Sequence, residues 1–534
     1  MDNRSDVIVV GAGAAGCVLA ARLSEDPGRR VTLLEAGGRD LNPLFRVPLM
    51  TGILLRSRYA NWFYHTEPQT ELEGRRSFWA RGRVIGGSTS INGMVWARGR
   101  PSDYDTWAQS GMPGWSWTEA LAAFRRIERF QNGASADHGG DGPLPITDGG
   151  ARNPLLDLFV QAGIQAGHPA SADFNAGSYE GVGRYHFTIA RGQRWSAARA
   201  FLDPARTRPN LRVVPRAQAL RVLVEAGRAT GVVTTAGTFH AGEIVLCGGA
   251  VNSPQLLMLS GIGPAEHLQA HGIATVADVP GVGRNLQDHL LVRVEHACTT
   301  PITLQSLTRL DRAAVALLQA LVLRTGPAAS FPLAAGFMLR SSPGLDEPDL
   351  QGHFLPGLTT GTLRVPGLSA PSRSGESHGF MANVTQMRPE SRGTITLRSA
   401  DPLAAPVIQP NYLSDPRDLA ALRGGAKVLR EIFAQPAFDP VRGAEMSPGP
   451  DVTSDDEIDA WIRRTADTMF HPVGSCRMGR DSDSYAVVDP QLRVRGVTGL
   501  RVADASIMPR ITSGNTAAPA MLIGHRCADF MTGA

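Results

Sequence analysis

The sequence predicts an α/β protein built from two regions of different texture. Short β-branched runs bounded by glycine occur near both ends of the chain, as in a buried parallel sheet. Residues 298–465 contain longer apolar runs with helical spacing and a strand-like segment at 392–399, which indicates a sheet with helices on one face. Because 534 residues exceed what one hydrophobic core usually supports, we expect two domains.

The N-terminal residues predict a βαβ unit. Residues 6–10 (DVIVV) are typical of a buried parallel strand, and GAGAAG follows at once. Residues 17–26 have the apolar spacing of a helix, and residues 31–37 (VTLLEAG) predict a second strand. The glycines therefore lie where the first strand turns into the helix, the arrangement of dinucleotide-binding units.

The glycine spacing at this turn is GxGxxG. Gly11, Gly13 and Gly16 allow a pyrophosphate to approach the N-terminus of the helix, whose dipole favours an anion. Glu35 follows Gly16 by 19 residues and can accept hydrogen bonds from ribose hydroxyls. The motif predicts dinucleotide binding but fits both NAD and FAD.

A second glycine-rich segment favours a flavin. Residues 78–107 have neither strand nor helix period over most of their length, and residues 82–92 read GRVIGGSTSIN. An isoalloxazine ring needs backbone donors along its edge in addition to a phosphate cradle, and such a segment can supply them.

The other elements can be placed from local patterns. Residues 210–215 and 220–250 predict a β-meander that ends in a buried strand. A helix should begin next, with Asn252 or Ser253 as N-cap and Pro254 at the first helical position. Near the C-terminus, residues 500–506 predict a buried strand and residues 515–531 a closing helix.

The composition argues against several partners. The net charge is +4, but the basic residues are scattered and no basic run is interleaved with aromatic residues, so we expect no nucleic-acid partner. The five cysteines form no CxxC pair, and no His and Cys cluster has metal-ligand spacing, so we expect no metal.

The chain has the features of a cytoplasmic protein. Its N-terminus runs straight into a predicted strand without a signal peptide, and the scattered cysteines fit a reducing compartment. The longest apolar helical run, residues 313–323, is shorter than the roughly 20 residues of a membrane span, so we expect no transmembrane segment. This run can be a buried helix or a surface that contacts a membrane.

Several motifs together resemble those of one flavoprotein family. They are DVIVVGAGAAG, GRVIGGSTSINGMVWARGRPSDYD, GAVNSPQLLMLSGIG, PGVGRNLQDH, FHPVGSCRMG and GNTAAPAMLIG, in this order along the whole chain. They are similar to the motifs of the glucose-methanol-choline (GMC) oxidoreductases. The segment RGQRWSAARAFLDP at 191–204 resembles members that oxidise alcohols, sorbose or furfuryl alcohol. For its arginines, Arg191, Arg194 and Arg199, we expect structural pairing.

The resemblance implies a Rossmann-like FAD-binding domain and a discontinuous substrate domain of antiparallel sheet plus helices. We expect the first domain in residues 1–155, 206–297 and 466–534 and the second in 156–205 and 298–465. The residues implied for FAD binding are Gly11, Gly13, Ala14, Ala15, Gly16, Glu35, Ala36, Arg83, Gly86, Gly87, Ser88, Asn92, Gly93, Met94, Val95, Asp504, Ala505, Asn515 and Thr516.

The stretch FHPVGSCRMG holds the implied catalytic base. In the family its histidine, here His471, faces flavin N5, and a histidine or asparagine about 44 residues later, here Asn515, completes the pair. Pro472 pushes the backbone of His471 out of the helical region, so the imidazole should point from an extended segment into a pocket. With an ordinary pKa near 6.5, it can accept an alcohol proton, while the Asn515 amide orients the hydroxyl.

Two positions depart from the patterns of individual members. Some members attach FAD covalently through a histidine where this chain has Ile91, so we predict non-covalent FAD. Members that oxidise choline have a glutamate about where this chain has Leu333, which favours a neutral alcohol over a quaternary ammonium. Residues 47–55 can form an entrance loop or a structural surface loop. His289 and His353 are weaker candidates for the cavity wall.

The resulting prediction is FAD-dependent oxidation of a neutral, most simply primary, alcohol to an aldehyde or ketone by hydride transfer to flavin N5. Oxygen or a quinone-like carrier would then reoxidise the flavin. The alternatives are choline dehydrogenase and a hydroxynitrile lyase-type flavoprotein without redox chemistry, because one fold supports several chemistries.

Overall fold

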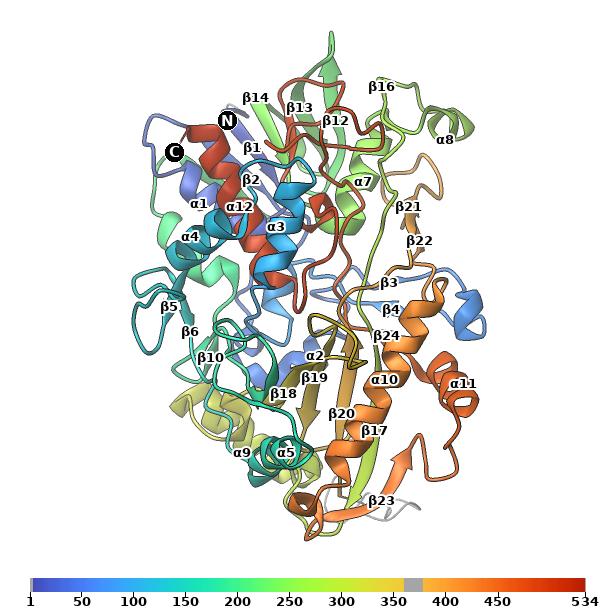
Figure 1. The fold of residues 1–534 in the computed structure, drawn as a ribbon. Helices are drawn as coiled ribbons and strands as arrows, with labels where there is room; N and C mark the ends of the chain where they lie inside the picture. Colours follow the sequence, from blue (N-terminus) through green and yellow to red (C-terminus); the bar gives the residue numbers. More distant parts are fainter. Residues whose placement is uncertain (1–2, 360–377, 534) are drawn as a thin grey trace.

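Two β-sheets organise the protein, one in the upper and one in the lower half of Figure 1. The structure is a computed structural model that describes residues 3–359 and 378–533. Both chain termini lie in the upper half, and the middle of the chain forms most of the lower half (Figure 1).

The upper sheet is parallel at its centre. Across the sheet, the strands are β11 (Leu211–Val214), β2 (Val31–Leu34), β1 (Arg4–Val10), β14 (Gly237–Leu246), β13 (Arg228–Thr234) and β12 (Ala219–Glu225), with β25 (Leu500–Val502) also paired to β14. Strand β1 is parallel to β2 and β14, whereas β12, β13 and β14 form an antiparallel meander. This parallel core confirms the predicted α/β class.

Helices from the two ends of the chain cover this sheet together. Helix α1 (Ala14–Leu23) packs beside α12 (Ala517–Thr532), which lies next to it in Figure 1. Helix α1 begins three residues before the predicted start, because its alanine- and glycine-rich first turn packs closely against the sheet. Ala15 and Gly16 are both buried there.

The prediction for the start of the next helix was wrong. Helix α7 (Gly249–Leu259) begins before Asn252, and Pro254 lies inside it rather than at its first position. Proline cannot donate to the carbonyl four residues earlier. The Ser475 hydroxyl donates to that carbonyl, of Ala250, at 2.5 Å, so the proline leaves no buried acceptor unpaired.

The lower sheet is almost entirely antiparallel. Its strands, in order, are β23 (Arg442–Ser447), β17 (Leu290–Cys298), β20 (Gly379–Gln386), β19 (Leu350–Leu355), β18 (Ala335–Leu339), β8 (Gly181–Arg184) and β7 (Ala170–Ser171), with β24 (Asp467–Thr468) also paired to β17. Helices α5 (Pro154–Gln165) and α10 (Pro416–Phe433) pack against this sheet. Side chains alternate between its two faces: Val292 and Val294 join the apolar core, whereas Leu291 and Arg293 face a cavity.

The strand pairing bears on the expected domain boundaries. Strands β17 and β24 belong to the lower sheet, although most of β17 and all of β24 lie in segments assigned to the FAD-binding domain. The division into domains remains a prediction, and the strand pairing places β17 and β24 with the predicted substrate domain.

Shorter elements connect the sheets. The remaining helices are α2 (Thr51–Leu54), α3 (Pro101–Gln109), α4 (Trp117–Ile127), α6 (Asp203–Ala205), α8 (Ala265–Ala270), α9 (Leu310–Leu318) and α11 (Asp455–Thr465). Two-stranded pairs are β3 (Tyr64–His65) with β4 (Phe78–Trp79), β5 (Glu128–Phe130) with β6 (Leu144–Ile146), β9 (Ile189–Ala190) with β10 (Gln193–Arg194), β15 (Ile262–Gly263) with β16 (Ala277–Asp278), and β21 (Thr394–Thr396) with β22 (Val407–Gln409).

The apolar run at 313–323 forms α9 and the helical turn after it. Ala316 and Ala320 are buried on its inner side, but Leu318 is 62% and Val322 67% exposed, so the helix is only half-buried. Within the described parts of the chain, no helix is long and apolar enough to cross a membrane.

Candidate active site

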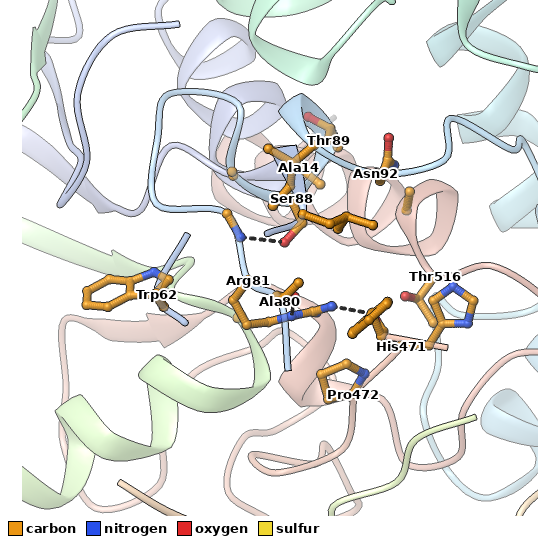
Figure 2. A pocket seen from close by; sticks show the side chains of 18 of the residues that line it. Ala14, Trp62, Ala80, Arg81, Ser88, Thr89, Asn92, His471, Pro472 and Thr516 are labelled. Atoms are coloured by element: carbon orange, nitrogen blue, oxygen red, sulfur yellow. Dashed lines mark hydrogen bonds between the residues drawn. The ribbon is translucent and has the colours of Figure 1, made fainter. Parts of the chain in front are cut away.

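A cavity of about 1510 Å³ is lined by residues of both sheets. Ordinary ligand pockets occupy roughly 300–1,000 Å³, so this cavity has room for a large cofactor and a substrate together. In Figure 2, Ala14, Ser88 and Asn92 lie in the upper part of the view and His471 and Pro472 in the lower part.

The first glycine turn fits a pyrophosphate. Gly11 has a φ of +108°, and a Cβ there would lie 2.4 Å from the Cys247 carbonyl oxygen; at Gly16 it would lie 1.9 Å from the Gly11 carbonyl oxygen. A Cβ on Gly13 would meet nothing within 4 Å, since Gly13 faces the cavity. Helix α1 has no side-chain cap, so the free N–H groups of its first turn can bind an anion.

Glu35 is fixed at the end of β2. Its carboxylate accepts hydrogen bonds from the backbone N–H of Ala12 at 2.9 Å and of Gly37 at 2.7 Å, and it lines the cavity. Burial raises the pKa of Glu35 to about 7, against the effect of these two hydrogen bonds. A ribose hydroxyl that donates to this carboxylate would stabilise its charged form further.

The second glycine-rich segment rests on the first. A Cβ on Gly87 would lie 2.7 Å from the Gly13 Cα. Buried Arg194 holds the end of the segment: its guanidinium donates to the Asn92 carbonyl at 2.5 Å and to the Thr51 hydroxyl at 2.6 Å. Arg194 therefore makes the structural hydrogen bonds that we expected, and these bonds support the wall of the cavity.

Most of the residues implied for FAD binding line the cavity. They are Gly11, Gly13, Ala14, Ala15, Glu35, Ala36, Gly87, Ser88, Asn92, Gly93, Met94, Val95, Asp504, Ala505, Asn515 and Thr516. Gly16, Gly86 and Arg83 are not among the lining residues. Gly16 packs against Gly11, Gly86 forms a left-handed turn with a φ of +91°, and Arg83 donates to Gln218 at 2.9 Å.

Asp504 joins two segments at the cavity wall. Its carboxylate accepts from the Gly249 N–H at 2.9 Å, the Ser253 hydroxyl at 2.5 Å and the Ser506 N–H at 2.8 Å. The start of α7 and the end of β25 are therefore fixed relative to each other, which places Ala505 on the cavity wall.

The structure brings the predicted catalytic pair together. Asn515 Nδ2 and His471 Nε2 are 3.2 Å apart, and both residues line the cavity. The backbone N–H of His471 donates to the buried carboxylate of Asp288 at 2.7 Å, and the hydroxyls of Thr468 and Tyr412 donate to the same carboxylate at 2.5 Å each. Asp288, which the sequence analysis did not single out, thus fixes the position of His471.

A second histidine sets the tautomer of His471. His289 Nε2 lies 3.0 Å from the Met387 carbonyl, which can only accept, so His289 carries its proton on Nε2. Its Nδ1 is then an acceptor, and His471 Nδ1, 3.0 Å away, must be the donor. The His471 Nε2 lone pair therefore points toward the cavity and the Asn515 amide, and it can accept a proton there.

Gln351 completes this arrangement from strand β19. Its amide Nε2 donates to the Asn515 Oδ1 at 3.1 Å, so the Asn515 Nδ2 is directed at His471. The sequence analysis ranked His289 as a weak candidate and did not name Gln351. The only available signal was the position of His289 at the end of the PGVGRNLQDH motif.

Burial lowers the pKa of His471 well below its ordinary value, and the neighbouring His289 and Arg81 lower it further. The Arg81 guanidinium donates to the carbonyl of Phe470, directly before the histidine. Burial also lowers the pKa of His289 to about 4. Both rings are therefore neutral near pH 7, which corrects the expectation of an ordinary pKa for His471.

The substrate side of the cavity combines apolar and polar walls. Phe331, Leu333 and His353 line this side. His353, a weaker candidate from the sequence, therefore does lie at the cavity wall. Residues 47–55 form short helical turns, and Leu49, Thr51, Gly52, Ile53 and Leu55 line the cavity. Ile53 is 55% exposed, which favours the entrance role for this segment.

Comparisons with known proteins agree along the chain. Residues 5–291 match the N-terminal family model of GMC oxidoreductase and residues 389–524 the C-terminal one. An oxygen-dependent choline dehydrogenase of Brucella ovis is 45% identical, over 99% of this chain and 96% of that protein. The mitochondrial choline dehydrogenase of Homo sapiens is 46% identical, over 98% and 89%.

Solved structures share the fold. Pyridoxine 4-oxidase from Mesorbium loti superposes with a TM-score of 0.87 at 33% identity, covering 99% of both chains. A formate oxidase of Aspergillus oryzae in which FAD modification was studied has a TM-score of 0.89 at 27% identity, covering 99% of this chain and 98% of its own.

Proposed function

Because the chain belongs to the GMC oxidoreductase family, we propose that it oxidises a neutral, most simply primary, alcohol to an aldehyde or ketone, with His471 as base and Asn515 orienting the hydroxyl. It is an FAD-dependent oxidoreductase acting on CH–OH groups. The observation that carries the residue roles is the 3.2 Å contact between His471 Nε2 and Asn515 Nδ2 at the cavity.

The residues present fit FAD. The turn at Gly11 and Gly13, the free N-terminus of α1 and the Glu35 carboxylate suit a pyrophosphate and a ribose, and the segment from Gly87 to Val95 offers a further wall. When bound, FAD supplies the acceptor for the hydride that leaves the alcohol carbon. Ile91 is buried where some members carry a histidine, which supports non-covalent attachment at this position.

The protein's own residues perform the proton step. His471 Nε2 accepts the proton of the substrate hydroxyl, while His471 Nδ1–H stays bonded to His289. The Asn515 amide donates to the substrate oxygen as negative charge develops on it, and Gln351 holds that amide in orientation. Low dielectric in the cavity strengthens both interactions.

The charges around the cavity support a neutral substrate. Among the described residues that line it, the carboxylates are Glu35, Asp467 and Asp504. Glu35 and Asp504 bind backbone N–H groups in the cofactor half, and Asp467 acts electrostatically on Arg75. Leu333 leaves the substrate side without the carboxylate that would offset a quaternary ammonium.

Choline is the second candidate. It is favoured by the full-length similarity to enzymes named choline dehydrogenase at 45% and 46% identity. The same relatives favour redox chemistry over the lyase alternative. We keep oxygen or a quinone-like carrier as the proposed electron acceptor, and the five free cysteines support a reducing, cytoplasmic compartment.

The visible spectrum of the purified protein tests the proposal. Without oxygen, neutral aliphatic, aromatic and sugar alcohols and choline are added in turn, and loss of the flavin absorbance is followed. We expect bleaching by neutral alcohols and much slower bleaching by choline. Bleaching by choline alone would overturn the neutral substrate, and bleaching by no alcohol would contradict alcohol oxidation. Admission of air then tests oxygen as acceptor.

A further inference from the structure

A row of hydrogen-bonding side chains crosses the substrate wall of the cavity. His353 on β19 is opposite Asn383 on β20, and Asn383 is opposite Arg293 on β17. All three residues line the cavity. Since directly opposite residues share one face of a sheet, His353, Asn383 and Arg293 form one strip, which we call the polar row (strands in Figure 1).

Two members of the polar row are buried with polar atoms that have no partner at hydrogen-bond distance and angle. His353 is 1% exposed, and neither ring nitrogen has a partner; Asn383 is 5% exposed, and its Oδ1 has none. Burial lowers the pKa of His353 to about 4, against the effect of the neighbouring Asn383 side chain, so its ring is neutral and offers one donor and one acceptor. Because buried polar groups are nearly always hydrogen-bonded, this wall is built for a polar ligand.

Arg293 extends the polar row with a charged donor. It is partly buried, and it makes no hydrogen bond or ion pair with any described residue. Burial raises the pKa of Glu295, two residues along the strand, and the charge of Arg293 opposes that rise. A guanidinium at the cavity wall repels a substrate cation and donates to oxygen.

The polar row lies beside the catalytic pair. Gln351, which bonds to Asn515, precedes His353 by two residues on the same strand and the same face. That spacing places His353 about 6.6 Å along the strand from Gln351, the residue that contacts Asn515. Asn383 lies on the neighbouring strand, a further ~4.8 Å from His353 across the sheet.

We propose that the polar row binds a second oxygen of the substrate, a hydrogen-bond acceptor about 7 Å or more from the hydroxyl that is oxidised. Arg293 donates to this oxygen, and the Asn383 amide bonds to it through its N–H groups or, where the oxygen is a hydroxyl, through its unpartnered Oδ1. The substrate class is therefore an oxygenated alcohol, such as a diol, a hydroxy ether or a hydroxy acid, rather than a simple alkyl alcohol or an aminoalcohol cation. This inference rests on the proposed function and specifies its substrate.

Four probes test the inference: n-pentanol, pentane-1,5-diol and 5-hydroxypentanoate, which share a five-carbon chain, and choline as the cationic alcohol. Anaerobic flavin reduction gives kcat/KM for each. We expect kcat/KM for the diol to exceed that for n-pentanol about tenfold, because a site built for an oxygen discriminates against analogues that lack it. The presence of two equivalent hydroxyls in the diol would by itself account for only a twofold increase. Comparison of the hydroxy acid with the diol shows whether the polar row prefers an anionic or a neutral oxygen. A higher kcat/KM for either oxygenated probe than for n-pentanol supports the inference.

Substitutions assign the effect to the polar row. In Asn383→Leu and Arg293→Met the diol-to-pentanol ratio should fall about tenfold, mainly through KM, because binding common to ground state and transition state is lost. Arg312→Met, at an exposed site on α9, is the matched control and should keep the ratio. Bound flavin reports folding of each variant. Arg293 is partly exposed, so Arg293→Met still tests the polar row if Asn383→Leu does not fold.

The outcomes separate this inference from the proposed function. Equal kcat/KM for n-pentanol and both oxygenated probes, or a preference that survives both substitutions, overturns the polar row as a substrate site. No reduction by any probe contradicts the proposed alcohol oxidation instead.

Discussion

The two walls of the cavity are built in opposite ways. The cofactor wall uses backbone groups from turns of consecutive residues: Gly11 to Gly16 form one turn, and residues 82–95 form the other. The catalytic and substrate wall depends on side chains from separate segments: His289, just before β17, bonds to His471 of the FHPVGSCRMG loop, and Gln351 on β19 bonds to Asn515. The first wall is encoded locally, and the second exists only when the lower sheet has formed.

This difference has a physical basis. A phosphate cradle needs positive φ angles and the absence of Cβ atoms, which glycine supplies wherever it stands. A proton-accepting histidine needs a defined tautomer, and only a partner fixed across the fold can provide it. Substitutions in the cofactor wall should therefore affect FAD retention, and substitutions in the other wall should affect rate.

Glycine substitutions are expected to have the largest effect. Gly11→Ala forces a Cβ to 2.4 Å from the Cys247 carbonyl at a φ of +108°, which should cost about 3 kcal/mol or more of folding stability. Gly13→Ala meets nothing in the protein, so the variant should fold normally and yet bind FAD roughly ten- to hundredfold more weakly. Thermal unfolding and flavin content separate the two. Normal FAD affinity in Gly13→Ala would contradict the cradle.

Loss of the proposed base comes next. His471→Ala should reduce the rate of flavin reduction by an alcohol about 10²- to 10⁴-fold, because the hydroxyl proton has no acceptor. Asn515→Ala removes one donor and no base, so it should cost less, about tenfold. Anaerobic stopped-flow spectroscopy measures both, with bound FAD as the folding control. A His471→Ala rate within about threefold of the unmodified protein would exclude the assigned role.

His289 tests whether the second wall depends on assembly. His289→Leu removes the acceptor for His471 Nδ1–H, and we expect roughly ten- to hundredfold slower flavin reduction with FAD still bound. His289→Gln retains an acceptor oxygen and should recover part of the rate. If Leu and Gln at this position behave alike, His289 packs against His471 without setting its tautomer.

The smallest expected effect is on pH dependence. Because burial holds the pKa of His471 well below its ordinary value, the neutral base predominates above that lowered pKa. The rate of flavin reduction should therefore change by less than about twofold between pH 6.5 and 8, and protonation should slow it only in more acidic solution. A histidine with its ordinary pKa near 6.5 would already be half protonated at the lower limit. A twofold or larger rise with a midpoint near pH 6.5 would contradict the burial effect.

The sequence predicted the cofactor wall in detail because its signals are local. The GxGxxG turn, the strands beside it and the pairing of FHPVGSCRMG with Asn515 could be identified by spacing and by family resemblance. The helix at Pro254 was misplaced, since the Ser475 hydroxyl that makes an internal proline acceptable comes from a distant segment. Arg83 also had a family signal, but it is not among the residues that line the cavity, and its guanidinium lies over the Trp62 ring.

By itself, the sequence determined the α/β class, the dinucleotide turn and the family, because these depend on backbone conformation and residue order. Only the tertiary structure decided the tautomer of His471, its lowered pKa, the support from Asp288 and the alignment of His353 with Asn383 and Arg293. Burial and hydrogen bonding between residues up to 183 positions apart determine these properties. They are set by how strands pair across the lower sheet, which local sequence does not encode.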